Sequence, residues 1–417
     1  MKRASLRKIQ VHYAGWGEDW LLGTLARAGN TTVFEYSDEA LQRGIEHSPV
    51  AFPLGRASFT DFGDVGDAIP GFIHDALPDG YGLLLIDRLL QRNGIERPDV
   101  FDRLAWIGDQ AMGALRFVPT NEADILYPDL PLRKLAEESQ RVVRGAAPDE
   151  LAMLAKVGGS AQGARPKALL QYDALNGQVS TLSDAPGDPW LFKFPSNGEH
   201  KEVCAIEALY ADLARDAGIE IPKTTHIDLG RNLAAFGVKR FDRQQRLRVP
   251  MQSMAGLLQV NFRNAGSVDY GDWLTATRLL TQSQREVEIA FKRIVFNVIF
   301  HNRDDHPKNF AWLLGDDGRW RVSPAFDLTF SNGPGGQHHL AIEGHGTETT
   351  RAVLCTLAEK RGIPAHVARN AIDDVLSAVD TLDSLISDRP IRKSTQRTLT
   401  QQIKACAALV RARSDGP

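Results

Sequence analysis

Cysteine is scarce in this sequence, with only Cys204, Cys355 and Cys406 among 417 residues. These three lie far apart and form no CxxC pair, so the sequence excludes a disulfide framework and offers no zinc-ligand spacing. Proteins of a reducing compartment have this character, and we expect a cytoplasmic location.

An excess of one charge is also missing, because 49 Lys and Arg stand against 52 Asp and Glu. A protein that binds nucleic acid by itself usually carries a basic surplus, so we expect any DNA contact to be made through a partner. No apolar run reaches the roughly 18 residues of a membrane span. The basic start "MKRASLRKIQVHYAGWG" alternates polar and apolar residues and lacks a signal core, so we expect neither export nor a membrane partner.

What the chain does have is length and 43% apolar residues, enough for two or three hydrophobic cores. We predict an N-terminal α+β accessory subdomain over residues 1–145, a small β-rich lobe over 146–245 and a helical lobe over 246–417. The first boundary rests on the turn-prone residues from Gly145 to Pro148.

Local patterns support this division. The runs "IQVHYAG" and "TTVFEYS" indicate strands, and "GYGLLLIDRLLQRNGI" indicates a helix. Further strands are predicted at "WLFKFP", "THIDLG" and "LAAFGVKRF". Ser283 and Glu286 form a capping box ahead of a helix that runs up to "FHNRDD", and "FAWLL" and "RWRVSPAF" flank the hairpin turn "GDDG".

The segment around this hairpin carries the groups that phosphoryl transfer from ATP requires. Asp304 and Asn309 are five residues apart, and Asp327 follows after the hairpin. Asp304 would accept or orient the proton of a substrate hydroxyl, while Asn309 and Asp327 would supply hard oxygen ligands to Mg²⁺. A single Asp-x-x-x-x-Asn also serves as a cap or turn, so the ordered set carries the prediction. Asp305 is predicted to be a supporting or solvated acid.

The predicted β-rich lobe carries candidates for binding the phosphates. Lys193 sits in an apolar strand, where snorkelling is the alternative, and Glu207 on the next helix is its candidate partner, although exposed helical acids are ordinary. The stretch "GGSAQGARPK" is predicted to form a phosphate-binding loop, with a plain tight turn as the alternative. Its candidate residues are Gly158, Gly159, Ser160, Gly163 and Lys167. The stretch "GVKRF", with Lys239 and Phe241, is predicted to lie where a kinase binds adenine.

Together "RDDHPKNF", "PAFDL", "VKRFDR", "GGSAQGARPK" and "LPDGYG" resemble the HipA-like serine/threonine kinases, the toxins of bacterial type II toxin–antitoxin systems. The resemblance covers nearly the whole chain. It implies an α+β, protein-kinase-like two-lobed fold with an accessory subdomain, and dependence on ATP and Mg²⁺. It also implies a protein substrate such as an aminoacyl-tRNA synthetase, and a helix-turn-helix antitoxin of the HipB kind through which DNA is reached.

The sequence departs from that family at the glycine-rich stretch. Val157 stands where the best-known members carry an autophosphorylated Ser, and Ser160 is the nearest hydroxyl, either a turn hydroxyl or a modification site. The stretch is also longer before Lys167. Two alternative functions stay open: a small-molecule phosphotransferase of the antibiotic-kinase kind, and a weakly active kinase fold that chiefly holds an antitoxin and its operator DNA.

Overall fold

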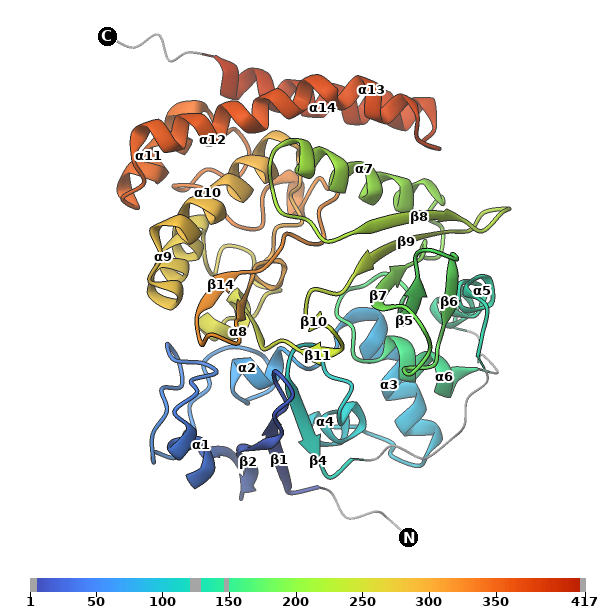
Figure 1. The fold of residues 1–417 in the computed structure, drawn as a ribbon, viewed down its shortest axis with the longest axis vertical. Coiled ribbons are helices and arrows are strands. Elements are labelled where there is room, and N and C mark those ends of the chain that lie inside the picture. Colours follow the sequence, from blue (N-terminus) through green and yellow to red (C-terminus); the bar gives the residue numbers. More distant parts are fainter. Residues whose placement is uncertain (1–5, 121–128, 146–149, 413–417) are drawn as a thin grey trace. The chain divides into compact units, whose positions relative to one another are not determined.

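The computed structural model describes residues 6–120, 129–145 and 150–412, and the chain divides into two compact units (Figure 1). The first unit contains Met1–Cys204, Thr225–Gln252 and Leu313–Gly318, and the second contains Ala205–Thr224, Ser253–Trp312 and Arg319–Pro417. Most of the predicted boundary from Gly145 to Pro148 lies outside the described residues.

An antiparallel sheet near the N-terminus has the strand order β3-β2-β1-β4. Its strands are β1 (Lys8–Tyr13), β2 (Trp20–Ala28), β3 (Thr31–Tyr36) and β4 (Leu115–Val118). In β1 the side chains of Ile9, Val11 and Tyr13 are buried and alternate with more exposed neighbours. This period of two is what a sheet with one covered face requires, and the strand predicted at "IQVHYAG" is present.

A second sheet in the same unit has the order β6-β5-β7-β9-β8. Its strands are β5 (Lys167–Asp173), β6 (Gln178–Ser180), β7 (Asp188–Lys193), β8 (Thr224–Asp228) and β9 (Ala234–Lys239). The predicted strands at "WLFKFP", "THIDLG" and "LAAFGVKRF" are therefore present. Short strands follow at β10 (Arg243–Gln244), β11 (Leu247–Arg248) and β12 (Met251–Ser253).

The helices of the first unit join both sheets in one hydrophobic core. They are α1 (Asp38–Arg43), α2 (Gly71–His74), α3 (Gly80–Arg92), α4 (Val100–Ile107), α5 (Leu132–Val143) and α6 (Leu151–Gly158). The core cluster includes Phe34 from the first sheet, Leu85 from α3 and Phe192 from the second sheet, all without exposed surface. The predicted accessory subdomain and β-rich lobe therefore share a single core.

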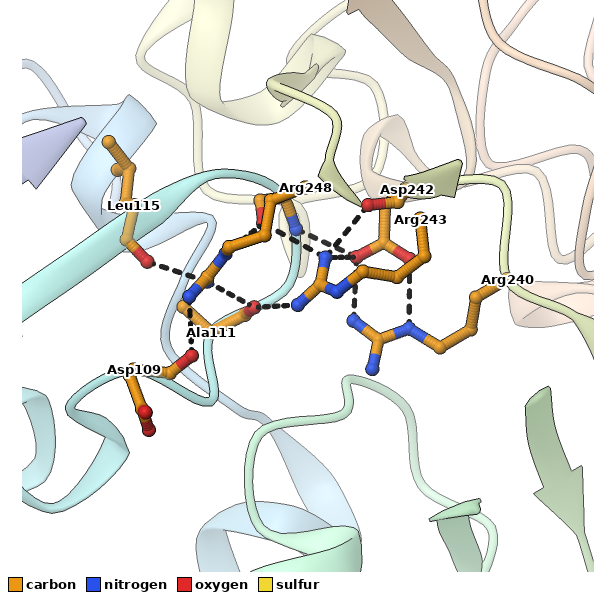
Figure 2. Close-up of polar contacts among 8 residues, drawn as sticks. Asp109, Ala111, Leu115, Arg240, Asp242, Arg243 and Arg248 are labelled. Carbon is orange, nitrogen blue, oxygen red and sulfur yellow. Dashed lines mark hydrogen bonds and ion pairs between the residues drawn. The ribbon is translucent and has the colours of Figure 1, made fainter. Parts of the chain in front are cut away.

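A buried polar cluster ties the β10–β11 hairpin to the loop between α4 and β4 (Figure 2). Asp242, 1% exposed, pairs with Arg240 over 2.7 Å and with Arg243 over 2.8 Å, and its carboxylate accepts the Gly113 N–H over 2.9 Å. The guanidinium of Arg248 donates to backbone carbonyls of the α4–β4 loop and of β4. These carbonyls belong to Asp109, Ala111, Gly113 and Leu115. The buried polar groups of the β10–β11 hairpin and of the α4–β4 loop thus form hydrogen bonds with each other in place of water.

The second unit is mainly helical, as predicted for the C-terminal part. Its helices are α7 (Glu202–Asp216), α8 (Met254–Leu258), α9 (Tyr270–Thr281), α10 (Gln284–Ile299), α11 (Arg351–Lys360), α12 (Ala365–Ala378), α13 (Leu382–Ser387) and α14 (Lys393–Arg411). Helix α10 packs against α9, α12 and α14 (Figure 1). The predicted hairpin is formed by β13 (Ala311–Leu314) and β14 (Trp320–Val322).

The start of α10 corrects one local prediction. Ser283 is the N-cap, and its hydroxyl accepts the Glu286 N–H over 3.4 Å. The Glu286 carboxylate does not return to the cap, because it accepts the Val322 N–H of β14 over 2.8 Å. A tertiary contact thus replaces half of the predicted capping box. Among the residues that the structure describes, no helix combines the length and apolar character needed to cross a bilayer.

Candidate active site

The chain leaves α10 through residues 302–309, here called the Asp304 loop, which exposes one carboxylate and buries its neighbours. Asp304 is exposed, whereas Asn302 and Asp305 are buried. Asn309 ends the 3₁₀ helix η1 (Pro307–Asn309), and its side-chain amide donates to the Asp304 carbonyl oxygen over 2.7 Å. This bond closes the five-residue spacing into a fixed turn and leaves the Asp304 side chain accessible.

Asp327 lies after β14 with a left-handed backbone, at a φ of 57°. Few non-glycine residues adopt this region, and Asp is among those that tolerate it. The neighbours of Asp327 in the chain, Phe326 and Leu328, line a cavity of about 10 Å³ that Asn309 and Asp305 also line. The structure therefore brings the Asp327 segment against the Asp304 loop.

The oxygens of Asn309 and Asp327 are suited to a magnesium ion. Because the Asn309 NH₂ group donates to the loop, its Oδ1 remains as the acceptor that a hard cation prefers. Within the described residues, no group of three or more His, Cys, Asp or Glu side chains could hold a metal ion. Mg²⁺ in phosphate-transfer sites takes one or two protein carboxylates and completes its shell with phosphate and water, so these residues fit a nucleotide-bound Mg²⁺.

An open pocket of about 540 Å³ adjoins Asp304, a volume within the range of ordinary ligand sites. Its walls include Phe262 and Arg263 from the loop after α8, His306 from the Asp304 loop, and Ser331, Gly333 and His339 from the segment after Asp327. The rings of His306 and His339 lie 6.0 Å apart. Burial, and secondly His306, lower the pKa of His339, so this imidazole is neutral at pH 7.

In the first unit, two lysines predicted to bind phosphate stand opposite each other. Lys193 ends β7 and Lys167 begins β5, and the two are direct partners in the ladder. Both are buried, with 6% and 3% of their surface exposed. The Lys167 ammonium donates a hydrogen bond to the Gln162 carbonyl oxygen in the glycine-rich loop. The ladder thus places two buried lysine side chains at facing positions of one sheet, and their binding of phosphate stays a prediction. Glu207 is buried on α7 in the second unit, and its ion pair with Lys193 remains a prediction.

The glycine-rich loop is shorter than predicted. Gly158 is the last residue of α6 and Gly159 is its C-cap, so the loop runs from Ser160 to Pro166 and the predicted start at Gly158 is wrong. A Cβ on Gly158 would lie 2.6 Å from the Lys167 carbonyl oxygen, so close packing of α6 on β5 requires glycine there. Gly163, with a φ of 104°, is the loop residue whose backbone requires glycine.

The motif "LPDGYG", residues 77–82, leads into the first turn of α3 and supports this loop, a role that the sequence did not reveal. The Gly163 N–H donates to the Asp79 carboxylate, and the Tyr81 N–H donates to the Gly163 carbonyl oxygen over 3.2 Å. A Cβ on Gly82 would lie 2.7 Å from the Gly159 carbonyl oxygen. The sequence does show a Pro-Asp-Gly turn at the start of a helix. This local pattern does not indicate that the turn contacts the glycine-rich loop.

Ser160 is the first residue of the loop and is 3% exposed. Its hydroxyl has no hydrogen-bond partner among the described residues. In this conformation the hydroxyl is inaccessible, so its phosphorylation would require the loop to open.

The stretch predicted to contact adenine lies at the end of β9. Lys239 is the last residue of this strand, and its ammonium pairs with Asp188 over 2.7 Å. The Arg240 N–H donates to the Pro189 carbonyl oxygen over 2.9 Å. The predicted contact runs through backbone groups, so it stays a prediction for Lys239 and for the half-buried Phe241.

A helical unit with a hairpin between the Asp304 loop and Asp327, together with a five-stranded sheet carrying buried lysines, defines a kinase-like α+β protein. The HipA of Shewanella oneidensis MR-1, solved with HipB and operator DNA, has this fold, with a TM-score of 0.70 and 20% identity over 96% of this chain and 95% of that one. Residues 15–118 match the HipA N-terminal domain and residues 159–382 the HipA-like C-terminal domain, so the chain belongs to the HipA family.

Two relatives extend this result at the sequence level. Y4dM of Sinorhizobium fredii, which carries a kinase name, is 26% identical over 290 residues, or 66% of this chain. The match spans 65% of that relative, just under two thirds of its length. The serine/threonine-protein kinase toxin HipA of Shewanella oneidensis is 23% identical over 354 residues, 79% of this chain and 76% of that protein. The predicted family and the predicted kinase-like fold are both confirmed.

Proposed function

We propose that this protein is an ATP- and Mg²⁺-dependent serine/threonine protein kinase of the toxin type. The observation that carries the proposal is the Asp304 loop, whose exposed carboxylate lines an open pocket while Asn309, at its other end, shares a cavity wall with the Asp327 segment. A phosphoryl-transfer enzyme needs an acceptor site beside a proton-accepting group and a cation site next to both.

Each of these residues has its own role in the proposed phosphoryl transfer. The Asp304 carboxylate accepts or orients the proton of the acceptor hydroxyl. Asn309 and Asp327 would hold Mg²⁺ through their oxygens, and the ion when bound neutralises phosphate charge. Lys193 and Lys167 pair with phosphate oxygens through charge-assisted hydrogen bonds.

The partners belong to the same proposal. The related HipA was solved with HipB and operator DNA, which supports an antitoxin partner for this chain, with DNA reached only through it. A translation component such as an aminoacyl-tRNA synthetase is the proposed substrate, as the family resemblance implies. Growth arrest on expression, relieved by co-expression of a helix-turn-helix antitoxin of the HipB kind, would support the toxin role.

Transfer of labelled γ-phosphate from ATP with Mg²⁺ tests the enzyme directly. We expect the wild type to label itself or a protein in a bacterial lysate, and Asp304→Ala to lower the rate by on the order of 10²–10⁴-fold. Asp327→Ala should lose activity that added Mg²⁺ partly restores, because a ligand to the ion is missing. Asp316→Asn, in the exposed hairpin turn, is the matched control and should retain activity.

The possible outcomes separate the alternatives. Equal labelling by wild type and Asp304→Ala would contradict the assignment of the base. ATP binding without labelling of any protein would favour the binding module, and labelling of an aminoglycoside alone would favour the small-molecule phosphotransferase.

A further inference from the structure

Asp305, the residue after the exposed Asp304, has a side chain with no exposed surface. Its carboxylate accepts three hydrogen bonds: from the Tyr270 hydroxyl over 2.5 Å, from the His338 Nδ1–H over 2.7 Å and from the His339 backbone N–H over 2.7 Å. Burying a carboxylate costs free energy unless hydrogen-bond donors replace the lost water, and three donors do so here.

The hydrogen bonds continue behind Asp305 into the scaffold. The Asn297 side-chain amide, on α10, donates to the Tyr270 hydroxyl over 2.9 Å. The Asn302 amide, at the start of the Asp304 loop, donates to the Asn297 Oδ1 over 2.9 Å. Tyr270 begins α9, so buried side chains from two helices fix the carboxylate from one side.

On its other side, Asp305 binds a segment that is almost free of regular structure. Residues 329–346, here called the wall segment, follow Asp327 and contain the short 3₁₀ helix η2 (Pro334–Gly336) and isolated β-bridges at Ser331, Ala341, Ile342 and His345. Gly333, Pro334 and His339 of this segment line the pocket beside Asp304. A glycine-rich segment loses much conformational entropy when it is ordered, so its position depends on the contacts that hold it.

We infer that Asp305 is a positioning residue that holds the wall segment in the shape that admits the acceptor hydroxyl to Asp304. This inference rests on the proposed function for its catalytic meaning, while the tether itself can be measured without activity. Charge-assisted hydrogen bonds in a site that excludes water are stronger than neutral ones, and the Asp305 carboxylate makes them to two consecutive residues of the segment. Backbone hydrogen bonds at Ser331 and Ala341 hold the segment on either side of this contact. Tyr270, Asn297 and His338 act through Asp305 and form one unit with it.

Amide hydrogen exchange of the full-length protein tests the tether. Asn has the shape of Asp, but its single oxygen and its NH₂ group cannot accept all three donors. In Asp305→Asn we expect exchange in residues 333–346 to be on the order of tenfold faster, with α9 and α10 unchanged. Unchanged exchange in residues 333–346 would overturn the inference, whatever the activity of the protein.

Steady-state kinetics provide the second arm. Asp305→Asn should raise the KM for the labelled protein acceptor on the order of tenfold and leave the KM for ATP within about twofold. His338→Gln removes the donor at the Nδ1 position, because the Gln NH₂ group lies about where Nε2 was, and it should also raise the KM for the protein acceptor. Because the two residues act as a unit, the double variant should be no worse than Asp305→Asn alone. Additive losses, or a change in ATP KM equal to that in acceptor KM, would contradict the positioning role.

The controls keep the test independent of folding and of the proposed function. Asp316→Asn makes the same chemical change at an exposed turn and should alter neither constant. If Asp305→Asn loses its cooperative thermal transition, the same two measurements are made on His338→Gln: amide exchange in residues 333–346 and the KM for the protein acceptor. If the wild type transfers no phosphate, the proposed function fails while the exchange comparison still decides the tether.

Discussion

At the scale of the residue, Asp242 illustrates how a buried charge is retained. Burial would raise the pKa of its carboxyl, but Arg240 and Arg243 outweigh burial and hold that pKa far below its ordinary value. In turn, burial lowers the pKa of Arg243 to about 9, since a charge in a dry site is costly even beside its partner. The cluster therefore depends on the single carboxylate that compensates its arginines.

Asp242→Asn should lower the free energy of unfolding at pH 7 by about 3–5 kcal/mol, because it leaves buried arginines uncompensated. Urea denaturation measures the change. Asp38→Asn is the matched control: its ion pair with Arg56 is 75% and 82% exposed on the two side chains, so it should cost no more than about 1 kcal/mol. Equal costs for the two substitutions would contradict the role of burial.

The same carboxylate predicts a pH dependence. Its folded pKa is depressed, so its stabilisation is fully present above the unfolded value of about 4 and is lost as the pH falls below that value. The difference in unfolding free energy between wild type and Asp242→Asn should therefore be constant from pH 7 to about 5 and shrink below about pH 4. Denaturation curves at these pH values check it, and a constant difference at low pH would contradict it.

At the scale of the element, the turn before α3 and the end of α6 hold the glycine-rich loop between them. The bond from the Gly163 N–H to Asp79 and the bond from the Tyr81 N–H to the Gly163 carbonyl oxygen restrict the backbone in the middle of this loop. A phosphate-binding loop gains affinity when its backbone is ordered before the ligand arrives. The N-terminal region thus holds the loop that we propose to bind phosphate.

Gly82→Ala should destabilise the protein by about 1–3 kcal/mol and weaken ATP binding, because its Cβ would press on the Gly159 and Ala161 carbonyl oxygens at 2.7 and 2.8 Å. Thermal unfolding and nucleotide titration measure the two effects. Gly55→Ala is the control, since its Cβ would meet only the Pro53 carbonyl oxygen at 3.9 Å. Unchanged ATP affinity in a destabilised Gly82→Ala would show that the turn supports packing alone.

At the scale of the whole molecule, the first unit combines regions that match two domains of the HipA family, the N-terminal domain and the C-terminal domain. Its core draws on residues from β1 through β9, on both sides of residue 145. Splitting such a core exposes apolar surface on each part. The N-terminal region is therefore a structural part of the first unit and not an appended module.

We accordingly expect residues 1–145, produced separately, to lack a cooperative thermal transition of their own and to bind ANS. The full-length chain is the reference. A sharp transition and a dispersed NMR spectrum for residues 1–145 alone would contradict a shared core.

The sequence by itself determined the family, the kinase-like class, most helices and strands, and the spacing from Asp304 to Asn309 and Asp327. These features depend on residues that are close together in the chain, so hydrophobic periodicity and turn residues in the sequence indicate them. Only the tertiary structure decided the burial of Asp305, the bonds from the "LPDGYG" turn to the loop and the pairing of Lys167 with Lys193. The tertiary structure also decided that the Glu286 carboxylate accepts the Val322 N–H and does not cap α10. Each of these joins residues distant in the chain, and no local pattern encodes which distant donor a polar side chain will meet.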